Sequence, residues 1–431
     1  MSRVGRSVSA PTRSQYDVLL PGVPRAQLRA MLAAHIVPWL ASGLPARIVV
    51  GDAEQVGDLT TLTVREPRAF YRRVGARGMI GFGESYQAGE WDTNDLAGLL
   101  ALVARRLDTL LPPWLRQLRR YVGPRRPRHA ENTIPGARRN ISHHYDLPDE
   151  MFALFLDDTM TYSCALFEVD HEGGPVADPT WLTSAQVRKV DRLLDATGVR
   201  AGSRVFEIGT GWGYLATRAA MRGASVRTIT ISAEQRRIAT ERVAAAGLSN
   251  LVDVELCDYR EAEPPGNGRA GYDAVLSVEM IEAVGERYWP EYFRTLDRLL
   301  APNGRVGLQA ITMRQDRMRV ARKTHSWLNE YIFPGGLVPS VASIEQTLER
   351  HTDLWVLNRF AFGAHYAQTL RVWRERFAAR EAELRRLGFS DTFCRTWQLY
   401  LASCEAGFRS GYLDVYQFVL GRRGAARGRE R

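Results

Sequence analysis

The stretch SRVFEIGTGWG, residues 203–213, decides the fold of this chain. Its first half is an apolar segment typical of a strand, and its second half carries three glycines in the pattern G-x-G-x-G directly before a helical segment. Glycine permits a tight turn and a close approach of the backbone to a ligand, and a helix N-terminus favours polar or negative groups. The stretch therefore predicts a strand, a ligand-binding loop and a helix.

Strands and helices alternate on both sides of this loop. The expected helices cover residues 183–198, 214–223, 233–247 and 287–304, and the expected strands cover 203–209, 225–232, 251–258, 272–280 and 305–312. The alternation predicts an α/β domain with a doubly wound, mainly parallel sheet, in which ligands bind at the carboxyl ends of the strands.

The length of 431 residues exceeds what one hydrophobic core usually supports. We expect four parts: a small N-terminal α+β domain at 1–108, a linker rich in Arg and Pro at 109–140, the ligand-binding domain at 141–420 and a basic tail at 421–431. In the first domain, strands are expected at 46–52 and 59–66 and helices at 69–78 and 95–111.

The chain carries a formal net charge of +10, with basic residues concentrated at 116–129 and 421–431. A positive excess favours a polyanionic partner, either nucleic acid or an anionic lipid surface, and a solvated linker and tail is the alternative. No nucleic-acid-binding motif accompanies the charge, so we expect no nucleic-acid partner. The N-terminus lacks the apolar run of a signal peptide, and Pro38 helps to interrupt the apolar patches of 31–50. We therefore expect a cytoplasmic protein that binds membranes peripherally.

The four cysteines form no C-x-x-C pair and no cluster with histidine at metal-binding spacing. This pattern is typical of a reducing compartment, and it argues against a structural zinc site. We expect no metal.

Two features of the loop favour S-adenosylmethionine (SAM) over a dinucleotide. A dinucleotide site needs the spacing G-x-G-x-x-G and an acid about 20 residues later for the ribose, whereas this loop is G-x-G-x-G after Glu207 and the second strand ends in TITISAEQ (228–235). The third strand ends in Asp258 and Tyr259, an acid that can accept from an adenine amino group and a ring that can stack on it. A simple helix N-cap at Asp258 is the alternative.

Several motifs resemble those of the cyclopropane fatty acid and mycolic acid methyltransferases. They are EIGTGWG (207–213), TISAEQ (230–235), DYR (258–260), SVEMIEAVG (277–285), HHYDL (143–147), MTYSCA (160–165), YIFPGG (331–336) and YLDVYQ (412–417). GFGESY (81–86) is similar to the N-terminal module of the bacterial phospholipid enzymes, which implies that the first domain associates with lipid or substrate. The resemblance covers about residues 60–420 and implies a class I SAM-dependent methyltransferase fold.

The resemblance also implies roles for individual residues. The expected SAM contacts, together with the rest of the glycine loop, are Tyr162, Ser163, Glu207, Gly209, Gly211, Gly213, Thr230, Gln235, Asp258 and Tyr259. A bicarbonate ion near the reacting carbon is expected to be held by the Cys164 backbone, Glu282, Ile311 and Tyr366. One position departs from the family, because Gln309 stands where cyclopropane synthases usually have His. Whether bicarbonate binds beside Gln309 is left open.

The chemistry expected of these residues is methyl transfer to an alkene. An alkene is a weak nucleophile, so it must lie against the methyl donor in a dry pocket, and the resulting carbocation must lose a proton to a base. Glu282 is expected to organise that step, Tyr366 to hydrogen-bond there and Tyr162 to stabilise positive charge by its ring face. The structural alternatives are a buried small residue for Cys164, a helix-surface carboxylate for Glu282 and core packing for Tyr366.

The resemblance therefore implies an enzyme that methylates the cis double bond of an oleoyl-type phospholipid acyl chain. The segments EIGTGWG, VEMIEAVG and LQAITM are similar to the subgroup that forms a mid-chain methylene, as in the route to tuberculostearic acid, with a separate reductase acting on the product. Cyclopropane formation is the alternative. A small-molecule methyltransferase and a non-catalytic lipid-binding protein are more distant alternatives, and the oligomeric state is left open, with a homodimer as one option.

Overall fold

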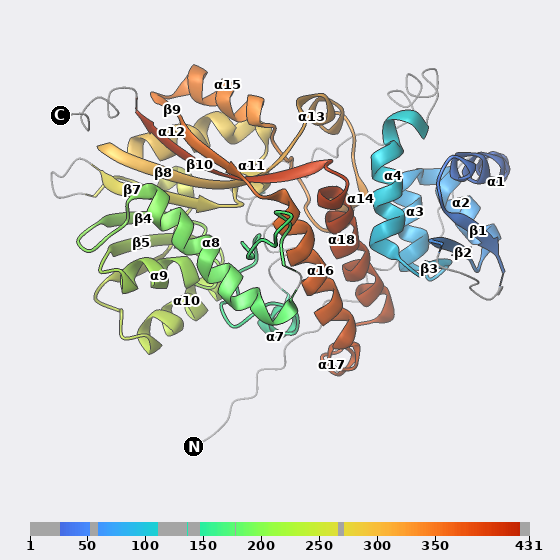
Figure 1. Cartoon of the computed structure of the whole chain (residues 1–431), viewed down its shortest axis with the longest axis horizontal. Helices are drawn as coiled ribbons and strands as arrows, with labels where there is room; N and C mark the ends of the chain where they lie inside the picture. Colours follow the sequence, from blue (N-terminus) through green and yellow to red (C-terminus); the bar gives the residue numbers. More distant parts are fainter. Residues whose placement is uncertain are drawn as a thin grey trace.

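The computed structural model describes residues 26–51, 59–110, 136, 147–176, 178–265 and 271–422, which form two sheets with their helices (Figure 1). Most of the HHYDL motif, nearly all of the predicted linker and most of the basic tail lie outside the described residues. The predictions about these segments, and the domain boundaries, stay predictions.

The N-terminal unit is a small α+β arrangement. Its described elements are α1 (Ala26–Ser42), β1 (Arg47–Val50), β2 (Thr61–Val64), α2 (Pro67–Arg77), α3 (Met79–Gln87), β3 (Trp91–Thr93) and α4 (Leu96–Leu110). β1 and β2 are parallel, and β3 pairs with β2 in the antiparallel direction.

The C-terminal unit contains the large sheet. Its strands are β4 (Arg204–Ile208), β5 (Ser225–Thr230), β6 (Val252–Leu256), β7 (Tyr272–Val278), β8 (Leu300–Met313), β9 (Leu354–Ala361) and β10 (Leu413–Arg422). Its α-helices are α7 (Asp149–Ala153), α8 (Leu182–Thr197), α9 (Tyr214–Met221), α10 (Ala233–Ala245), α11 (Ile281–Val284), α12 (Trp289–Leu299), α13 (Gln315–Ala321), α14 (Trp327–Tyr331), α15 (Val341–His351), α16 (Gly363–Ala379), α17 (Glu381–Arg386) and α18 (Asp391–Arg409). Short 3-10 helices occupy Pro179–Trp181, Tyr259–Glu261 and Glu286–Tyr288.

The strands of the large sheet lie in the order β6-β5-β4-β7-β8-β10-β9, in which the first five are parallel and β10 runs antiparallel to β8 and β9. Successive residues of β4 point to opposite faces. Val205 packs with α8, α9 and α10, whereas Phe206 and Ile208 pack with α12 and α15. Helices therefore cover both faces (Figure 1), and the predicted doubly wound, mainly parallel sheet is confirmed.

Some predicted boundaries are wrong. The helix expected at 287–304 ends at Leu299, and residues 300–304 begin β8 instead. Pro302 explains the difference, because proline inside a helix removes a hydrogen bond and clashes with the preceding turn. The sequence pattern also does not predict α1, α3 or β3; α1 contains Pro38, and α3 contains glycines that weaken the helical pattern.

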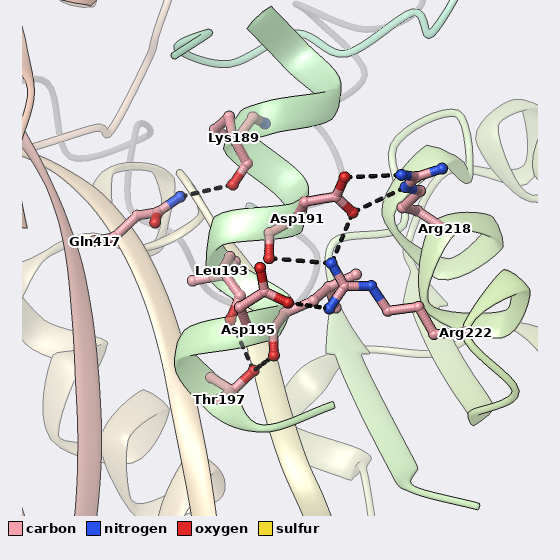
Figure 2. Close-up of polar contacts among 9 residues, drawn as sticks. Lys189, Asp191, Leu193, Asp195, Thr197, Arg218, Arg222 and Gln417 are labelled. Carbon is pink, nitrogen blue, oxygen red and sulfur yellow. Dashed lines mark hydrogen bonds and ion pairs between the residues drawn. The ribbon is translucent and has the colours of Figure 1, made fainter. Parts of the chain in front are cut away.

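Ion pairs anchor α8 to α9 beside the large sheet (Figure 2). Asp191 pairs with Arg218 and Arg222 at 2.8 Å each, and Asp195 pairs with Arg222 at 2.5 Å. On the sheet side, the Gln417 side chain of β10 donates to the backbone carbonyl of Lys189 at 3.1 Å. These contacts hold α8 between the sheet and α9, with the Lys189 side chain next to the cavity described below.

The N-terminal unit shares its hydrophobic core with the C-terminal unit. Phe70 and Trp91 belong to the same buried cluster as Trp397 of α18, and α3 and α4 pack on α18. Buried Glu84 of α3 accepts from the Tyr331 hydroxyl at 2.8 Å. The GFGESY motif therefore lies at the contact between the two units.

Gly83 allows α3 to approach α14, because a Cβ at this position would overlap the indole ring of Trp327. We expect Gly83→Ala to lower the free energy of unfolding by about 1–3 kcal/mol through overpacking. Denaturant unfolding measures the change. Gly174→Ala is the control, since its Cβ would have only a 3.3 Å contact with the Asp170 side chain, and equal stability of the two variants would contradict the packing argument.

Candidate active site

A cavity lies at the carboxyl ends of β4, β5, β6 and β7, bordered by the segment that precedes α8. Nine of the predicted cofactor residues line it: Tyr162, Ser163, Glu207, Gly209, Gly211, Thr230, Gln235, Asp258 and Tyr259. Gly213 is outside the lining. Its φ is +83°, and an added Cβ would lie 2.9 Å from the Cβ of Ala239, so this glycine lets α9 pack on α10.

The glycine loop presents backbone to the cavity. Gly209 and Gly211 have φ values of +95° and +52°, a region that favours glycine. A Cβ at Gly211 would meet no protein atom within 4 Å, because it would point into open space. The loop backbone therefore borders the cavity, and direct contact between these glycines and the cofactor stays a prediction.

Two polar groups on β4 and β5 face the same cavity. Buried Glu207 accepts from the Thr228 hydroxyl at 2.6 Å, and burial raises the pKa of Glu207 to about 8. Thr230 donates to the Gln235 side chain at 2.9 Å. Gln235 thus lies where the second strand ends, the position at which a dinucleotide site would place its ribose-binding acid.

Asp258 acts as the helix cap that the sequence left as an alternative. Its carboxylate accepts from the Arg260 backbone at 3.1 Å and from the Arg260 guanidinium at 2.8 and 2.7 Å. Asp258 and Tyr259 nevertheless both line the cavity. A role for Asp258 toward an adenine amino group stays a prediction.

Lys189 is a site residue that the sequence prediction missed. It is 1% exposed and lines the cavity, and its ammonium donates to the Ser163 hydroxyl at 2.8 Å. Burial lowers the pKa of Lys189 to about 8. One feature of the sequence could have pointed to Lys189: it and Lys323 are the only lysines in a chain whose other basic residues are almost all arginine.

Glu279 is the second residue that the sequence prediction missed, and three hydrogen-bond donors meet at its carboxylate. Its Oε1 accepts from the Cys164 backbone at 3.0 Å and from the Gln309 amide at 2.8 Å, and its Oε2 accepts from the Tyr366 hydroxyl at 2.6 Å. Burial raises the pKa of Glu279, and these three donors oppose the rise.

The backbone of Glu279 is strained. Its φ is +53°, and within the described part of the chain the one other non-glycine residue with positive φ is Met160. Both line the cavity. Non-glycine residues in this region are uncommon and cluster at functional sites, where the surrounding contacts hold them.

Glu282 lies three residues further on, at the start of α11. Its Oε1 accepts from the Ile311 backbone at 2.5 Å, whereas its Oε2 is buried without a hydrogen-bond partner in the described structure. Burial, with a smaller contribution from Glu279, raises the pKa of Glu282 to about 8. The surface alternative for Glu282 is therefore wrong, because this carboxyl group is buried.

The remaining predicted residues assemble around these two carboxyls. The Cys164 thiol is fully buried and its pKa is raised by burial, so this residue contributes its backbone N–H. Cys164, Tyr366 and Ile311 all donate to Glu279 or Glu282. These donors are thus already used by the protein's own carboxyl groups, and the arrangement does not fit a bicarbonate ion between them.

The family model for mycolic acid cyclopropane synthetase matches residues 133–418. The chain belongs to this family. It is 48% identical over 409 residues, 94% of each chain, to the tuberculostearic acid methyltransferase UfaA1 of Mycobacterium tuberculosis. It is 35% identical over 357 residues, 82% of this chain and 86% of the relative, to the cyclopropane-fatty-acyl-phospholipid synthase of Escherichia coli.

A solved family structure supports the same assignment. The mycolic acid cyclopropane synthase CmaA1, complexed with SAH and CTAB, superposes with a TM-score of 0.57 at 28% identity and covers 68% of this chain and 98% of its own. This chain is an S-adenosylmethionine-dependent methyltransferase, and its predicted class I fold is confirmed. SAM is its cofactor, and the glycine loop with its open space at Gly211 fits that ligand.

Proposed function

We propose that this enzyme transfers a methyl group from SAM to the cis double bond of an oleoyl-type acyl chain in a phospholipid and leaves a mid-chain methylene group. The names of the UfaA1 and Escherichia coli relatives support a fatty acyl substrate. The observation that carries the proposal is Glu279, a partly buried carboxyl with three donors at the edge of the cofactor cavity.

Aromatic residues give the cavity an apolar wall at Tyr162. Tyr162 packs against Phe152 and Trp373 with ring centroids 5.4 and 5.2 Å apart, and its hydroxyl lies 2.6 Å from that of Tyr400. Aromatic faces tolerate a neighbouring cation. This apolar wall therefore suits both an acyl chain and the carbocation that forms on it.

Bound SAM supplies an electrophilic methyl group on its sulfonium. Addition of this methyl to one alkene carbon leaves the positive charge on the other. A hydride shift from the methylated carbon to the cation, followed by proton loss from the new methyl, gives the methylene; proton loss without the shift closes a cyclopropane ring. In both cases the proton needs a base in a dry site, and Glu279 is the base we assign.

Gln309 supports the methylene product. An amide holds Glu279 through its N–H group, but it does not titrate near neutral pH and cannot relay a proton as a histidine can. Without a relay, proton removal from the carbocation is slower, so the hydride shift can occur before the proton is lost. A separate reductase acting on the methylene and a homodimeric state stay predictions.

Association with a membrane surface is also part of the proposal. The described helices include none with the length and apolar character needed to cross a bilayer. α1, however, carries no acidic residue and exposes Leu28, Met31, Leu32 and Trp39, each more than half exposed. An apolar helix face on a positively charged protein is suited to the surface of an anionic bilayer.

Vesicles of matched lipids test the proposed substrate. With SAM labelled in its methyl group, we expect label in the fatty acids of dioleoyl phospholipid and none in those of distearoyl phospholipid, which lacks the double bond. Label in neither lipid, or in the headgroup of both, would contradict the proposed function.

A further inference from the structure

A chain of side-chain hydrogen bonds runs from α8 through the sheet to Glu279. Arg192 donates to the Gln417 carbonyl oxygen at 2.6 Å, Gln417 donates to the Gln309 carbonyl oxygen at 3.1 Å, and Gln309 donates to Glu279 at 2.8 Å. Gln309 and Gln417 lie directly opposite each other on β8 and β10 and are 0% and 1% exposed. Bulk water therefore cannot replace these partners.

The two ends of this hydrogen-bond chain, Arg192 and Glu279, fix the orientation of both amide side chains. A guanidinium can only donate and an ionised carboxylate can only accept. Arg192 therefore faces the oxygen of Gln417, whose NH2 group must face Gln309, and the NH2 group of Gln309 must face Glu279. The same Gln417 nitrogen also donates to the Lys189 carbonyl (Figure 2), so all of its hydrogens are used.

We propose that Arg192 and Gln417 are positioning residues for proton removal, because they orient the Gln309 amide as a donor to Glu279. Arg192 is itself held in place, since its guanidinium lies 3.8 Å from the centroid of the Phe360 ring and Phe360 is the cross-strand partner of Gln417. The inference rests on the proposed function, in which Glu279 is the base.

Loss of Arg192 weakens the constraint on the amides, because in the described structure the Lys189 carbonyl is then the one remaining group that holds the NH2 group of Gln417 in place. Gln309 can then present its oxygen to Glu279, which repels the carboxylate and raises the pKa of Glu279 further. The ionised base is populated only above that pKa, so the acid limb of the kcat profile moves to higher pH.

The other groups that face Glu279 stay the same in such a variant. The titratable groups are Tyr366 from α16, Glu282 from α11, Lys189 from α8 and Cys164 from the preceding segment. A shift of the acid limb in a variant that keeps the Arg192 charge therefore reports the lost donor.

Arg192→Met tests the proposal, since methionine keeps an unbranched side chain against Phe360 and removes the donors. We expect kcat on dioleoyl vesicles to fall roughly 10- to 100-fold, less than the loss of the base itself, with the acid limb at higher pH and SAM affinity unchanged. Gln417→Met should behave in the same way. Arg192→Lys, which keeps a donor-only cation, should restore most of the rate.

Arg359→Met is the matched control, because this arginine lies beside Phe360 on β9 and pairs with Glu345 at the exposed surface. It should leave kcat and the pH profile unchanged. Infrared titration of the carboxyl band that Glu279→Gln removes gives a readout apart from turnover, and its midpoint should rise in Arg192→Met.

A double-variant cycle separates positioning from a structural role. In a Gln309→Met background the hydrogen-bond chain to Glu279 is already interrupted, so Arg192→Met should cost no further activity. The proposal would be overturned if the kcat losses of the two single variants multiply in the double variant. It would also be overturned if Arg192→Met lowers kcat while the acid limb and the infrared midpoint stay unchanged. Wild-type protein assayed in parallel separates failure of this proposal from failure of the proposed function. If the wild type labels no dioleoyl lipid, the proposed function itself fails.

Discussion

Replacing Glu279 by glutamine should reduce kcat by about 10²–10⁴-fold, the range typical of losing acid–base help, with SAM affinity nearly unchanged. The amide is isosteric but cannot take up the proton that the carbocation must lose. It would also place an NH2 group against one of the three donors that now point at the carboxylate. Steady-state kinetics on dioleoyl vesicles and calorimetry with SAM measure the two quantities.

Glu282→Gln is the matched control for this loss. Burial raises the pKa of Glu282 to about 8, so its carboxyl group is largely protonated at neutral pH, and a glutamine keeps an oxygen for the Ile311 N–H. We expect a smaller loss than in Glu279→Gln. The opposite order would return the base to Glu282, the residue that the sequence alone singled out.

Glu279→Gly adds a chemical rescue. Glycine adopts the φ of +53° without strain, and the variant frees the Cys164, Gln309 and Tyr366 donors for a small anion. Added bicarbonate or formate should then restore part of the activity. Rescue of Glu279→Gly but not of Glu279→Gln, whose side chain still fills the position, would support a carboxylate acting at this point.

Gly211→Val should weaken SAM binding by at least about 100-fold, which corresponds to roughly 2.7 kcal/mol. The added side chain would occupy open space at a residue that lines the cavity, and it forces a β-branched residue to a φ of +52°. Calorimetric titration with SAM measures the change. Gly247→Val is the control, because Gly247 has a φ of +69° with open space around it but lies away from the cavity. Equal loss in both variants would show that backbone strain, not cofactor contact, explains the effect.

The sheet and the glycine loop are predictable because their signals are local. Apolar strand segments, alternating helices and the G-x-G-x-G spacing are each contained within a few residues. The end of α12 at Leu299 is harder to predict, because the helical pattern continues to Leu300 and only Pro302 indicates the earlier end. The shared core of the two units is not local, because α3 and α18 are more than 300 residues apart in sequence.

The role of Glu279 shows why the site is harder to predict than the fold. Glu279 and Glu282 belong to the same motif, and a sequence pattern gives no reason to prefer the first. What distinguishes Glu279 is a set of donors that lie 115, 30 and 87 residues away in sequence and meet only in the folded chain. Lys189 is similar, because its place on an amphipathic helix does not show that its ammonium is buried against Ser163.

Proton NMR of the fatty acid methyl esters made from dioleoyl phospholipid vesicles, SAM and the purified enzyme tests the central claim most directly. Mass cannot decide between the two products, because the methylene and the cyclopropane are isomers. The account predicts vinylidene protons from a mid-chain methylene. Cyclopropane protons alone would contradict it, and would show that proton loss precedes the hydride shift in this active site.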